Sequence, residues 1–584
     1  MVSPVRKLAL LAFIATVLLV VGGCAEKRAP TAAIRIRWAH DPETLAPLAL
    51  HSQAAMDASN LMHLSLLQVN SQLVTLEPAL AAQLPTVSQR GDSVTTFRYT
   101  IRPNATWDDG RPVLAADVAC TLKLMSCPGI PNEIARSNFG QIRQIELNPA
   151  NSREFTLVCQ GQSPELLLVT GDFFILPEAA LDPRHRLRSY SLTALQRRPA
   201  TQFPDSALAQ VAKQYEAADL ANHPEHALGC GPYRLARWEK DHYLSFQRKP
   251  NWWGRTVAGF PPALRARAPQ LDYLVIPNAS AAALALRRGD LDVFPQIPAA
   301  DFNRFRTSPS PDVRLYVSNS YDIALAGFNT RRPALADALT RQALSRLFDT
   351  AGLLRGTQQG RGQRTAGLVP PFDRPNYNDS LSPVPYDPPG ARARLQQAGW
   401  QPPTASRANW RRASPQGEQV LRLAIRYRSG DELFATAALQ FRAAAASLGI
   451  AVELRPTESA LFGKALADGD FDLFMRTLHG NPFALNFTSL LHSGTSSETN
   501  STRFGNPACD QLLDAVASAN DSPQRVRKLR QLQALLQQQA PIVPLFFLAN
   551  RVAARRACQG LYVSSVKPGF VAPTIERTAA AASR

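Results

Sequence analysis

The sequence has few lysines and no dense block of charge. Its 64 basic residues against 46 acidic ones give a formal net charge of +18, and only nine of the basic residues are lysine, which leaves 55 arginines. Such a balance can mark a nucleic-acid or membrane-surface partner. Here the arginines are scattered singly among acids, without aromatic–basic alternation, so we expect a solvated basic surface and no nucleic-acid partner.

Repeats and known catalytic motifs are also missing. No repeat of about 20–50 residues is visible, which excludes solenoids and propellers. The sequence has no H-E-x-x-H, G-x-S-x-G or Walker loop, and the S-x-x-K at 564–567 lacks the S-D-N and K-T-G motifs that penicillin-binding chemistry needs. We therefore expect a protein that is not an enzyme and has no metal or cofactor. A hydrolase whose site is assembled from distant segments remains the alternative.

Cysteine is scarce and has no C-x-x-C spacing, which argues against zinc ribbons and thioredoxin-like sites. Apart from Cys24 there are six cysteines, and about 15 pairings of six are possible. A disulfide between Cys509 and Cys558 is the preferred pairing, because both lie late in the chain near expected helix ends. Free buried thiols are the alternative.

Only the N-terminus has a long apolar run. Arg6 and Lys7 precede about 14 apolar residues that end at Val21, and Gly22-Gly23-Cys24 follows. This is the layout of a secretory signal peptide, and the run is short for a hydrocarbon core of ~30 Å. Its end resembles a bacterial lipobox, so we expect residues 1–23 to be removed and Cys24 to be lipidated. An uncleaved anchor is the alternative; removal of the signal leaves a charge of about +16.

Helical and strand patterns alternate along the rest of the chain. Residues 95–101 alternate like a half-buried strand, and Asp387-Pro388 is typical of a helix start. From 434 to 448 one helical face is apolar, Gly449 follows, and 450–454 alternate again. This order predicts an α/β fold, and the length predicts two or three lobes.

A series of short motifs runs through most of the chain in a fixed order. They are Leu45-Ala-Pro47, Glu77–Ala81, Phe97–Arg102, Trp107–Pro112, Ala116–Val118, Gly229-Cys230-Gly231-Pro232-Tyr233, Asn251–Gly254, Gly289–Val293, Phe328–Thr330, Arg341–Leu344, Tyr386–Pro388 and Ala398–Trp400. The series resembles the extracytoplasmic solute-binding proteins of ABC importers of peptides and nickel, the oligopeptide/dipeptide/nickel-binding family 5. Cys230 replaces the threonine usual in the family's G-T-G-P-Y motif.

The resemblance implies a two-lobed fold of the periplasmic-binding-protein type II-like class, with a hinge and an extra subdomain inserted in the first lobe. The implied parts are a signal peptide (1–23), lobe I (24–63, 177–323 and 547–584), the inserted subdomain (64–176) and lobe II (324–546). We expect the chain to cross between lobes near Tyr321–Asn329 and Leu545–Asn550.

The function implied is that of a monomeric, lipid-anchored binding protein at the periplasm or cell surface. It would capture a peptide-like or related small solute in the cleft between the lobes and deliver it to the permease subunits of an ABC importer. A sensor built on the same fold is a further alternative to transport.

Peptide binders of this family carry an acid after an "F-D" strand, where it pairs with the peptide's ammonium group. In this chain Asn481 falls at that place after Phe471-Asp472, and no acid occurs from 473 to 497. An amide offers no charge, so the charge-assisted bond is lost, while Arg476 and His479 add positive character. We therefore expect a blocked, neutral or anionic solute, unless a short deletion shifts the alignment.

Further candidate ligand contacts come from the segment before the first helix, the inserted region, the hinges and a strand end in the second lobe. They are His51, Ser52, Gln53, Phe139, Tyr321, Arg426, Tyr427 and Phe546.

Overall fold

The computed structural model describes residues 33–578 except 51, 92, 199–205, 224, 225, 227, 406, 407, 416, 497, 498, 520 and 521. The expected signal peptide and lipidation site at Cys24, and the candidate His51, lie outside the described residues. In the described part, no helix is both long and apolar enough to cross a membrane.

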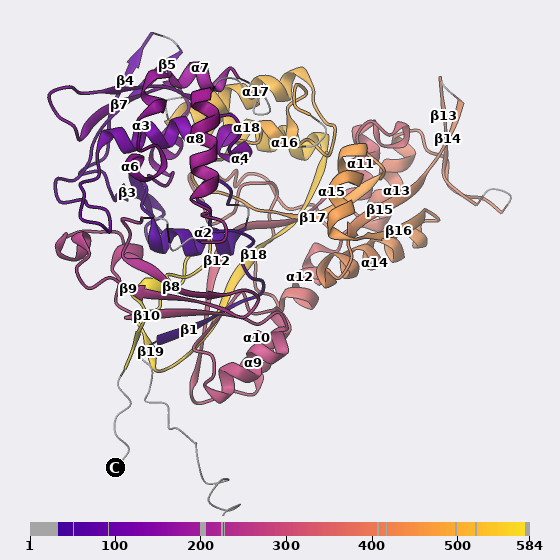
Figure 1. Ribbon diagram of the computed structural model, residues 1–584. Coiled ribbons are helices and arrows are strands. Elements are labelled where there is room, and N and C mark those ends of the chain that lie inside the picture. The colour runs from indigo at the N-terminus through magenta and orange to yellow at the C-terminus, as the bar shows by residue number, and fades with distance from the viewer. Residues whose placement is uncertain are drawn as a thin grey trace, which may run out of the picture. The chain divides into compact units, whose positions relative to one another are not determined.

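A mixed sheet of ten strands runs through the protein (Figure 1). In spatial order the strands are β16 (Ala451–Thr457), β15 (Arg422–Arg428), β17 (Leu473–Leu478), β12 (Val313–Phe328), β18 (Ile542–Arg555), β11 (Val293–Pro295), β1 (Ala33–Trp38), β10 (Gln270–Val275), β9 (Tyr243–Arg248) and β8 (Tyr233–Glu239). Strand β15 is parallel to β16 and β17, and β1 is parallel to β11. The pairs β17–β12, β12–β18, β18–β11, β10–β9 and β9–β8 are antiparallel.

The two longest strands, β12 and β18, connect the two lobes. They pair antiparallel from Val313 opposite Arg555 to Gly327 opposite Ile542. Val313 packs in a cluster with helix residues 282–305, whereas Ala324 and Phe546 pack in a different core. The ladder shifts register between Asn319 and Ile323, so residues 320–322 bulge where one core gives way to the other. Both predicted crossings fall on these strands, and the boundaries of the lobes along the chain remain a prediction.

A smaller sheet lies in the N-terminal half and has its own core. Its strands are β4 (Thr86–Arg90), β5 (Val94–Thr100), β7 (Glu154–Gln160) and β6 (Ile142–Leu147), in that order. The strand predicted at 95–101 is confirmed as β5. Tyr99 and Phe155 on its buried face stack at 5.8 Å, and Trp107 packs in the same core.

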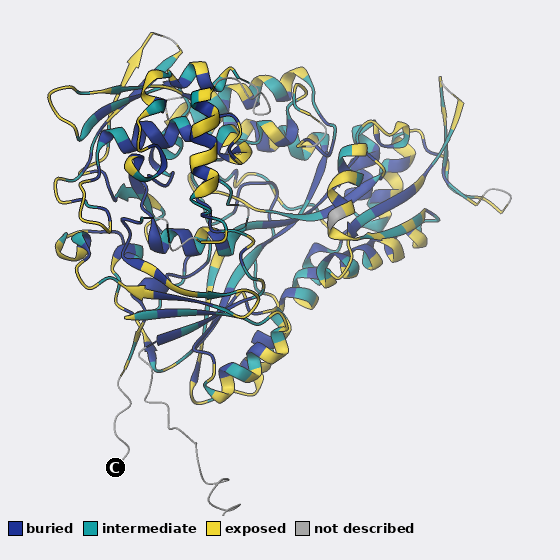
Figure 2. Ribbon diagram, viewed as in Figure 1, coloured by how far each residue is buried: buried dark blue, intermediate teal, exposed yellow. Residues whose placement is uncertain are grey.

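Helices of the second lobe begin and end where the sequence predicts. Asp387 caps α13 (Pro388–Gln397) by accepting a hydrogen bond from the Gly390 amide at 2.9 Å. Gly449 follows α14 (Glu432–Ser447) with a φ of +77°, a conformation that favours glycine. The central strands are mostly buried, and the outward faces of the helices are exposed (Figure 2).

The remaining elements surround these sheets. They are α2 (Gln53–Met62), α3 (Ala115–Leu124), α4 (Glu133–Phe139), α5 (Leu166–Gly171), α6 (Glu178–Leu181), α7 (Leu192–Gln196), α8 (Ser206–Ala217), α9 (Ala279–Arg288), α10 (Ala299–Thr307), α11 (Ala338–Ser345), α12 (Thr350–Gln358), α15 (Ser459–Asp468), α16 (Thr488–Leu491), α17 (Pro507–Ser518) and α18 (Ser522–Gln539), with the strand pairs β2 (Leu67–Asn70) and β3 (Thr75–Pro78), β13 (Arg411–Ser414) and β14 (Gly417–Val420), and β19 (Cys558–Gln559) and β20 (Glu576–Arg577).

The preferred disulfide between Cys509 and Cys558 is wrong. Neither cysteine forms a disulfide within the described part of the chain, and both are buried, as are the other four described cysteines. Cys509 packs with Leu529 in one core and Cys558 packs with Ile34 in another. Each cysteine therefore packs as a small apolar side chain in its own core. Both lie late in the chain, but the fold keeps them in different cores.

Candidate functional site

A cavity of about 330 Å³ lies beside the bulge of β12. Segments far apart in the sequence form its wall: α2, the β2 region, the residues after α5, the loop after β17 and the C-terminal loop. Its polar lining residues are Gln53, Asp57, Asn60, Gln68, Ser71, Asp172, Ser320, Tyr321, Asp322, Asn481, Ser565 and Lys567.

Helix α2 brings the first carboxylate to this cavity. Ser52 caps the helix through its Oγ, which accepts from the Ala55 amide at 3.2 Å. Gln53 follows Ser52 directly, and its Nε2 donates at 2.7 Å to Oδ1 of Asp57, which lies one turn further along the helix. Both side chains line the cavity. Burial raises the pKa of Asp57 to about 7, although the Gln53 hydrogen bond and the charge of Lys567 oppose the shift. Ser52 thus shapes the site through the backbone, and Gln53 orients the acid.

A second carboxylate comes from the end of α5. Asp172 lines the cavity and accepts a hydrogen bond from Ser65 Oγ at 3.4 Å. Burial raises its pKa to about 6. Neither Asp57 nor Asp172 forms an ion pair within the described part of the chain. Both carboxyls can therefore change protonation state near neutral pH.

The third carboxylate, Asp322, is already paired. Its Oδ2 lies 3.0 Å from His479 Nδ1 and 3.4 Å from Lys567 Nζ, and those two nitrogens are 2.8 Å apart. Burial alone would raise the pKa of Asp322, but the hydrogen bond and charge of His479, together with Lys567, hold it below its usual value. The cluster joins β12, the residue after β17 and the C-terminal loop.

The S-x-x-K motif at 564–567 contributes to this cluster without forming a catalytic pair. Ser564 Oγ donates to the Ser71 carbonyl at 2.6 Å and accepts from the Val566 amide at 3.0 Å. The Lys567 ammonium instead faces Asp322 and His479. Lysine is therefore not placed to activate this serine.

Besides Gln53, two further candidates predicted from the sequence line the cavity, Tyr321 and Asn481. Tyr321 lies in the bulge with the edge of its ring against Phe372, at a centroid distance of 4.9 Å, and burial raises its pKa to about 12. Asn481 also lines the cavity, and its Oδ1 accepts from the Phe483 amide at 2.9 Å. The side chain thus shapes its own loop.

Other candidates lie outside the cavity lining. Phe546 is 0% exposed and Tyr427 is 7% exposed, and both belong to the second lobe's core. Phe139 packs on Phe173, with ring centroids 5.4 Å apart, at the core of the N-terminal half. Arg476 lies in β17 opposite Leu325, where burial lowers its pKa. Burial supports a packing role for Phe546 and Tyr427, and the ring contact with Phe173 supports one for the partly buried Phe139.

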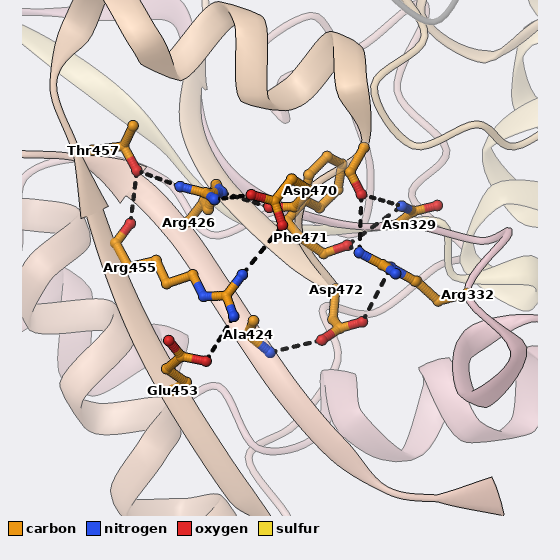
Figure 3. A network of polar contacts seen from close by, with 11 residues as sticks. Asn329, Arg332, Ala424, Arg426, Glu453, Arg455, Thr457, Asp470, Phe471 and Asp472 are labelled. Atoms are coloured by element: carbon orange, nitrogen blue, oxygen red, sulfur yellow. Dashed lines mark hydrogen bonds and ion pairs between the residues drawn. The ribbon is translucent and has the colours of Figure 1, made fainter.

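Arg426 is engaged in a network at the end of β15 (Figure 3). Its guanidinium pairs with Asp470, which also accepts from Arg455 at 3.2 Å. Arg455 in turn donates to Glu453 at 2.8 Å. The prediction that Arg426 reaches the cleft finds no support in this geometry, because its charge is neutralised within the second lobe.

Sequence reasoning missed the three carboxylates of the cavity. Asp57 could have been found from helical spacing, since it lies one turn after Gln53 on the same face. Asp322 is adjacent to a predicted hinge residue. Nothing in the local sequence marks Asp172, because only packing brings the end of α5 to the cavity. Within the described ranges, no group of three or more His, Cys, Asp or Glu residues could hold a metal ion.

Two α/β lobes joined by paired strands beside a polar cavity define a two-lobed solute-binding protein. A model of the bacterial extracellular solute-binding proteins, family 5, matches residues 75–499, so the chain belongs to this family. Proteins of this family work outside the cytoplasm as solute receptors of ABC importers.

Individual relatives are distant. Protein XP55 of Streptomyces lividans is 27% identical over 514 residues, covering 85% of this chain and 80% of its own. NikA from Brucella suis, solved with Fe(III)-EDTA, has a TM-score of 0.73 at 20% identity and covers 94% of this chain and 100% of its own. AppA from Bacillus subtilis, solved with a nonapeptide, has a TM-score of 0.70 at 16% identity, covering 94% and 99%. The two structures show that the fold is shared.

Proposed function

We propose that this protein captures a peptide-like or related small solute in the cavity beside the β12 bulge and delivers it to an ABC permease. The observation that carries the proposal is the position of the cavity. It lies where β12 passes from one core to the other, and both lobes contribute to its wall. Closure of two lobes about such strands would bury a solute from water.

The lining favours a solute with a cationic group. Asp57 and Asp172 are half-buried carboxylates without an ion pair within the described part of the chain, and Asp322 holds the nearby Lys567. A cationic group on the solute would stabilise the ionised forms of these carboxyl groups. It would offset the free-energy cost of burying a charged carboxylate without a partner. The missing acid at Asn481 suggested a neutral or anionic solute, whereas these carboxylates support a cationic one bound through other elements.

Binding to matched peptides tests the proposal. We expect the purified protein to bind a free-amine peptide more tightly than its N-acetylated form by isothermal titration. Asp172→Asn should weaken the free-amine peptide about tenfold, the loss expected for one buried charge-assisted bond, and leave the acetylated form unchanged. Glu146→Gln, an exposed acid remote from the cavity, serves as the matched control. Equal affinity for both forms, or no binding of any small solute by native mass spectrometry, would refute the proposal.

The proposal includes a lipid anchor at Cys24, a monomeric state and the lobe boundaries given above. It rests on the lipobox-like Val21-Gly22-Gly23-Cys24 and on the extracellular family. Labelled palmitate should enter the wild-type chain in a bacterial host and should fail to enter Cys24→Ser. Incorporation into Cys24→Ser would overturn the assigned attachment site.

A further inference from the structure

A second cavity, of about 640 Å³, lies in the second lobe at the far end of β12 and β18 from the bulge. It shares no lining residue with the solute cavity. Three arginines line it, Arg331, Arg341 and Arg503, together with hydroxyl and amide groups that include Ser493 and Thr495. Among the described residues that line it there is no carboxylate.

Arg341 places a fixed positive charge in the wall. Its side chain is 2% exposed, and its guanidinium donates to the carbonyl oxygens of Leu335 at 2.7 Å, Ala336 at 2.8 Å and Gln539 at 2.7 Å. These partners are all neutral, so the charge is hydrogen-bonded and yet has no ion pair within the described residues. Burial lowers the pKa of Arg341 to about 10, which still leaves it charged at neutral pH.

Arg503 is held in an uncommon backbone conformation. Its φ is +53°, in the left-handed region that arginine rarely adopts. Nη2 donates to the Ala467 carbonyl at 2.7 Å, while the buried Nε has no hydrogen-bond partner among the residues that the structure describes. Backbone strain of this kind persists where the surroundings hold it, and it gathers at binding sites.

The third guanidinium group, that of Arg331, belongs to an exposed residue. Arg331 is exposed at the rim of the cavity and forms no ion pair within the described part of the chain. Its neighbour Arg332 differs, because it lies 3.5 Å from Asp472 in the network of Figure 3. Two acids lie near the wall: Asp510 accepts from Ser493 Oγ, and the charge of Asp337 opposes the lowering of the Arg341 pKa. Arg331, Arg341 and Arg503 therefore line one cavity, and none of them forms an ion pair with a carboxylate that the structure describes.

We propose that this second cavity binds a small molecule bearing an oxyanion, a phosphate or a carboxylate. Arginine forks match such groups with two parallel hydrogen bonds. Arg341 and Arg503 would supply positive charge at fixed positions in the wall. Arg331 would contact the anion from the rim of the cavity. The site is independent of the solute cavity, so the protein can hold the two ligands together.

Thermal-shift and calorimetric titrations of the full chain with inorganic phosphate and with citrate, at constant ionic strength set by chloride, test the inference. We expect one of these anions to stabilise the wild-type protein in a saturable manner. Arg503→Gln should weaken binding at least tenfold, and Arg331→Gln about threefold. Arg332→Gln, whose charge faces Asp472, should bind as the wild type does.

Two outcomes would overturn the inference. One is the absence of saturable binding of both anions to the wild type, and the other is an equal response of wild type, Arg331→Gln and Arg332→Gln. Because Arg331 is exposed, its substitution keeps the test valid if Arg503→Gln fails to fold. Asp172→Asn should retain the anion response, which separates this site from the proposed solute site.

Discussion

Arg525 Nη2 lies 3.9 Å from Glu165 Oε1, and this ion pair joins α18 of the second lobe to the residue that precedes α5. The two side chains are 16% and 18% exposed, so the contact is largely shielded from solvent. Helix α5 also carries Leu168, which lines the cavity beside the β12 bulge, and ends next to Asp172. The pair therefore bridges the two sides of the molecule that enclose the cavity.

Arg525→Ala should open this contact. Removal of the arginine leaves the shielded Glu165 carboxylate without its ion-pair partner. We expect this to destabilise the arrangement in which α18 contacts the start of α5 by about 1 kcal/mol, and to weaken solute binding about fivefold. Small-angle scattering should show a larger radius of gyration without solute. Arg90→Ala, which removes an exposed pair with Glu146, is the control and should change neither quantity. Unchanged scattering and affinity in Arg525→Ala would contradict a closing role.

Asp57→Asn should stabilise the protein in a pH-dependent way. Burial raises the pKa of Asp57 in the folded protein from 3.8 to about 7. Below pH ~4 the carboxyl group is protonated in both the folded and the unfolded protein. As the pH rises to about 7 the unfolded protein loses this proton first, so the free energy of unfolding falls. The asparagine variant has no charge to bury. Allowing for solvent screening at this half-buried site, its advantage should grow from near zero at pH 4 to about 1–2 kcal/mol at pH 7.5. Denaturant unfolding at several pH values measures it, and an advantage that shrinks as pH rises would refute the assignment.

Gly231→Ala should destabilise the fold strongly. A Cβ at this position would lie 2.7 Å from the Leu61 carbonyl oxygen and 2.8 Å from that of Met62, both backbone atoms at the end of α2. The Gly231 amide also donates to the Met62 carbonyl at 2.8 Å, so the segment before β8 cannot move away without losing this bond. We expect a loss of about 2–4 kcal/mol in the free energy of unfolding.

Gly356→Ala is the matched control for this substitution. Gly356 lies in α12 with no atom within 4 Å of a Cβ placed there. Alanine favours helix, so this variant should gain up to about 1 kcal/mol. Similar effects of the two substitutions in chemical denaturation would show that close backbone approach is not the cause.

The six described cysteines should behave as buried thiols. Burial raises the pKa of Cys509 and of Cys558 to about 12, which suppresses the reactive thiolate. Native protein should therefore resist alkylation at these positions, and unfolded protein should react at all six without prior reduction. Mass spectrometry counts the labels. A melting temperature that falls on addition of reductant would indicate a disulfide instead.

Local structure could be predicted because local chemistry decides it. Examples are the Asp387 cap, the glycine after α14 and the alternation in β5. Each depends on residues only a few positions apart, and tertiary packing is consistent with all three. The candidate site was harder to predict. Tyr321, Gln53 and Asn481 line the cavity, whereas Phe546 and Tyr427 pack in the second lobe's core. The strand around Phe546 is buried on both faces, so its sequence pattern does not distinguish a core position from a cavity wall.

The sequence by itself determined the α/β class, the ends of the main helices and strands, and the motifs typical of family 5 solute-binding proteins. Only the tertiary structure decided which charges meet. Asp57, Asp172 and Asp322 come from three distant segments, and Lys567 joins them from the C-terminal loop. Likewise Cys509 and Cys558, close in sequence, belong to separate cores. Charge pairing and desolvation depend on distances across the fold, and local propensity carries no information about those distances.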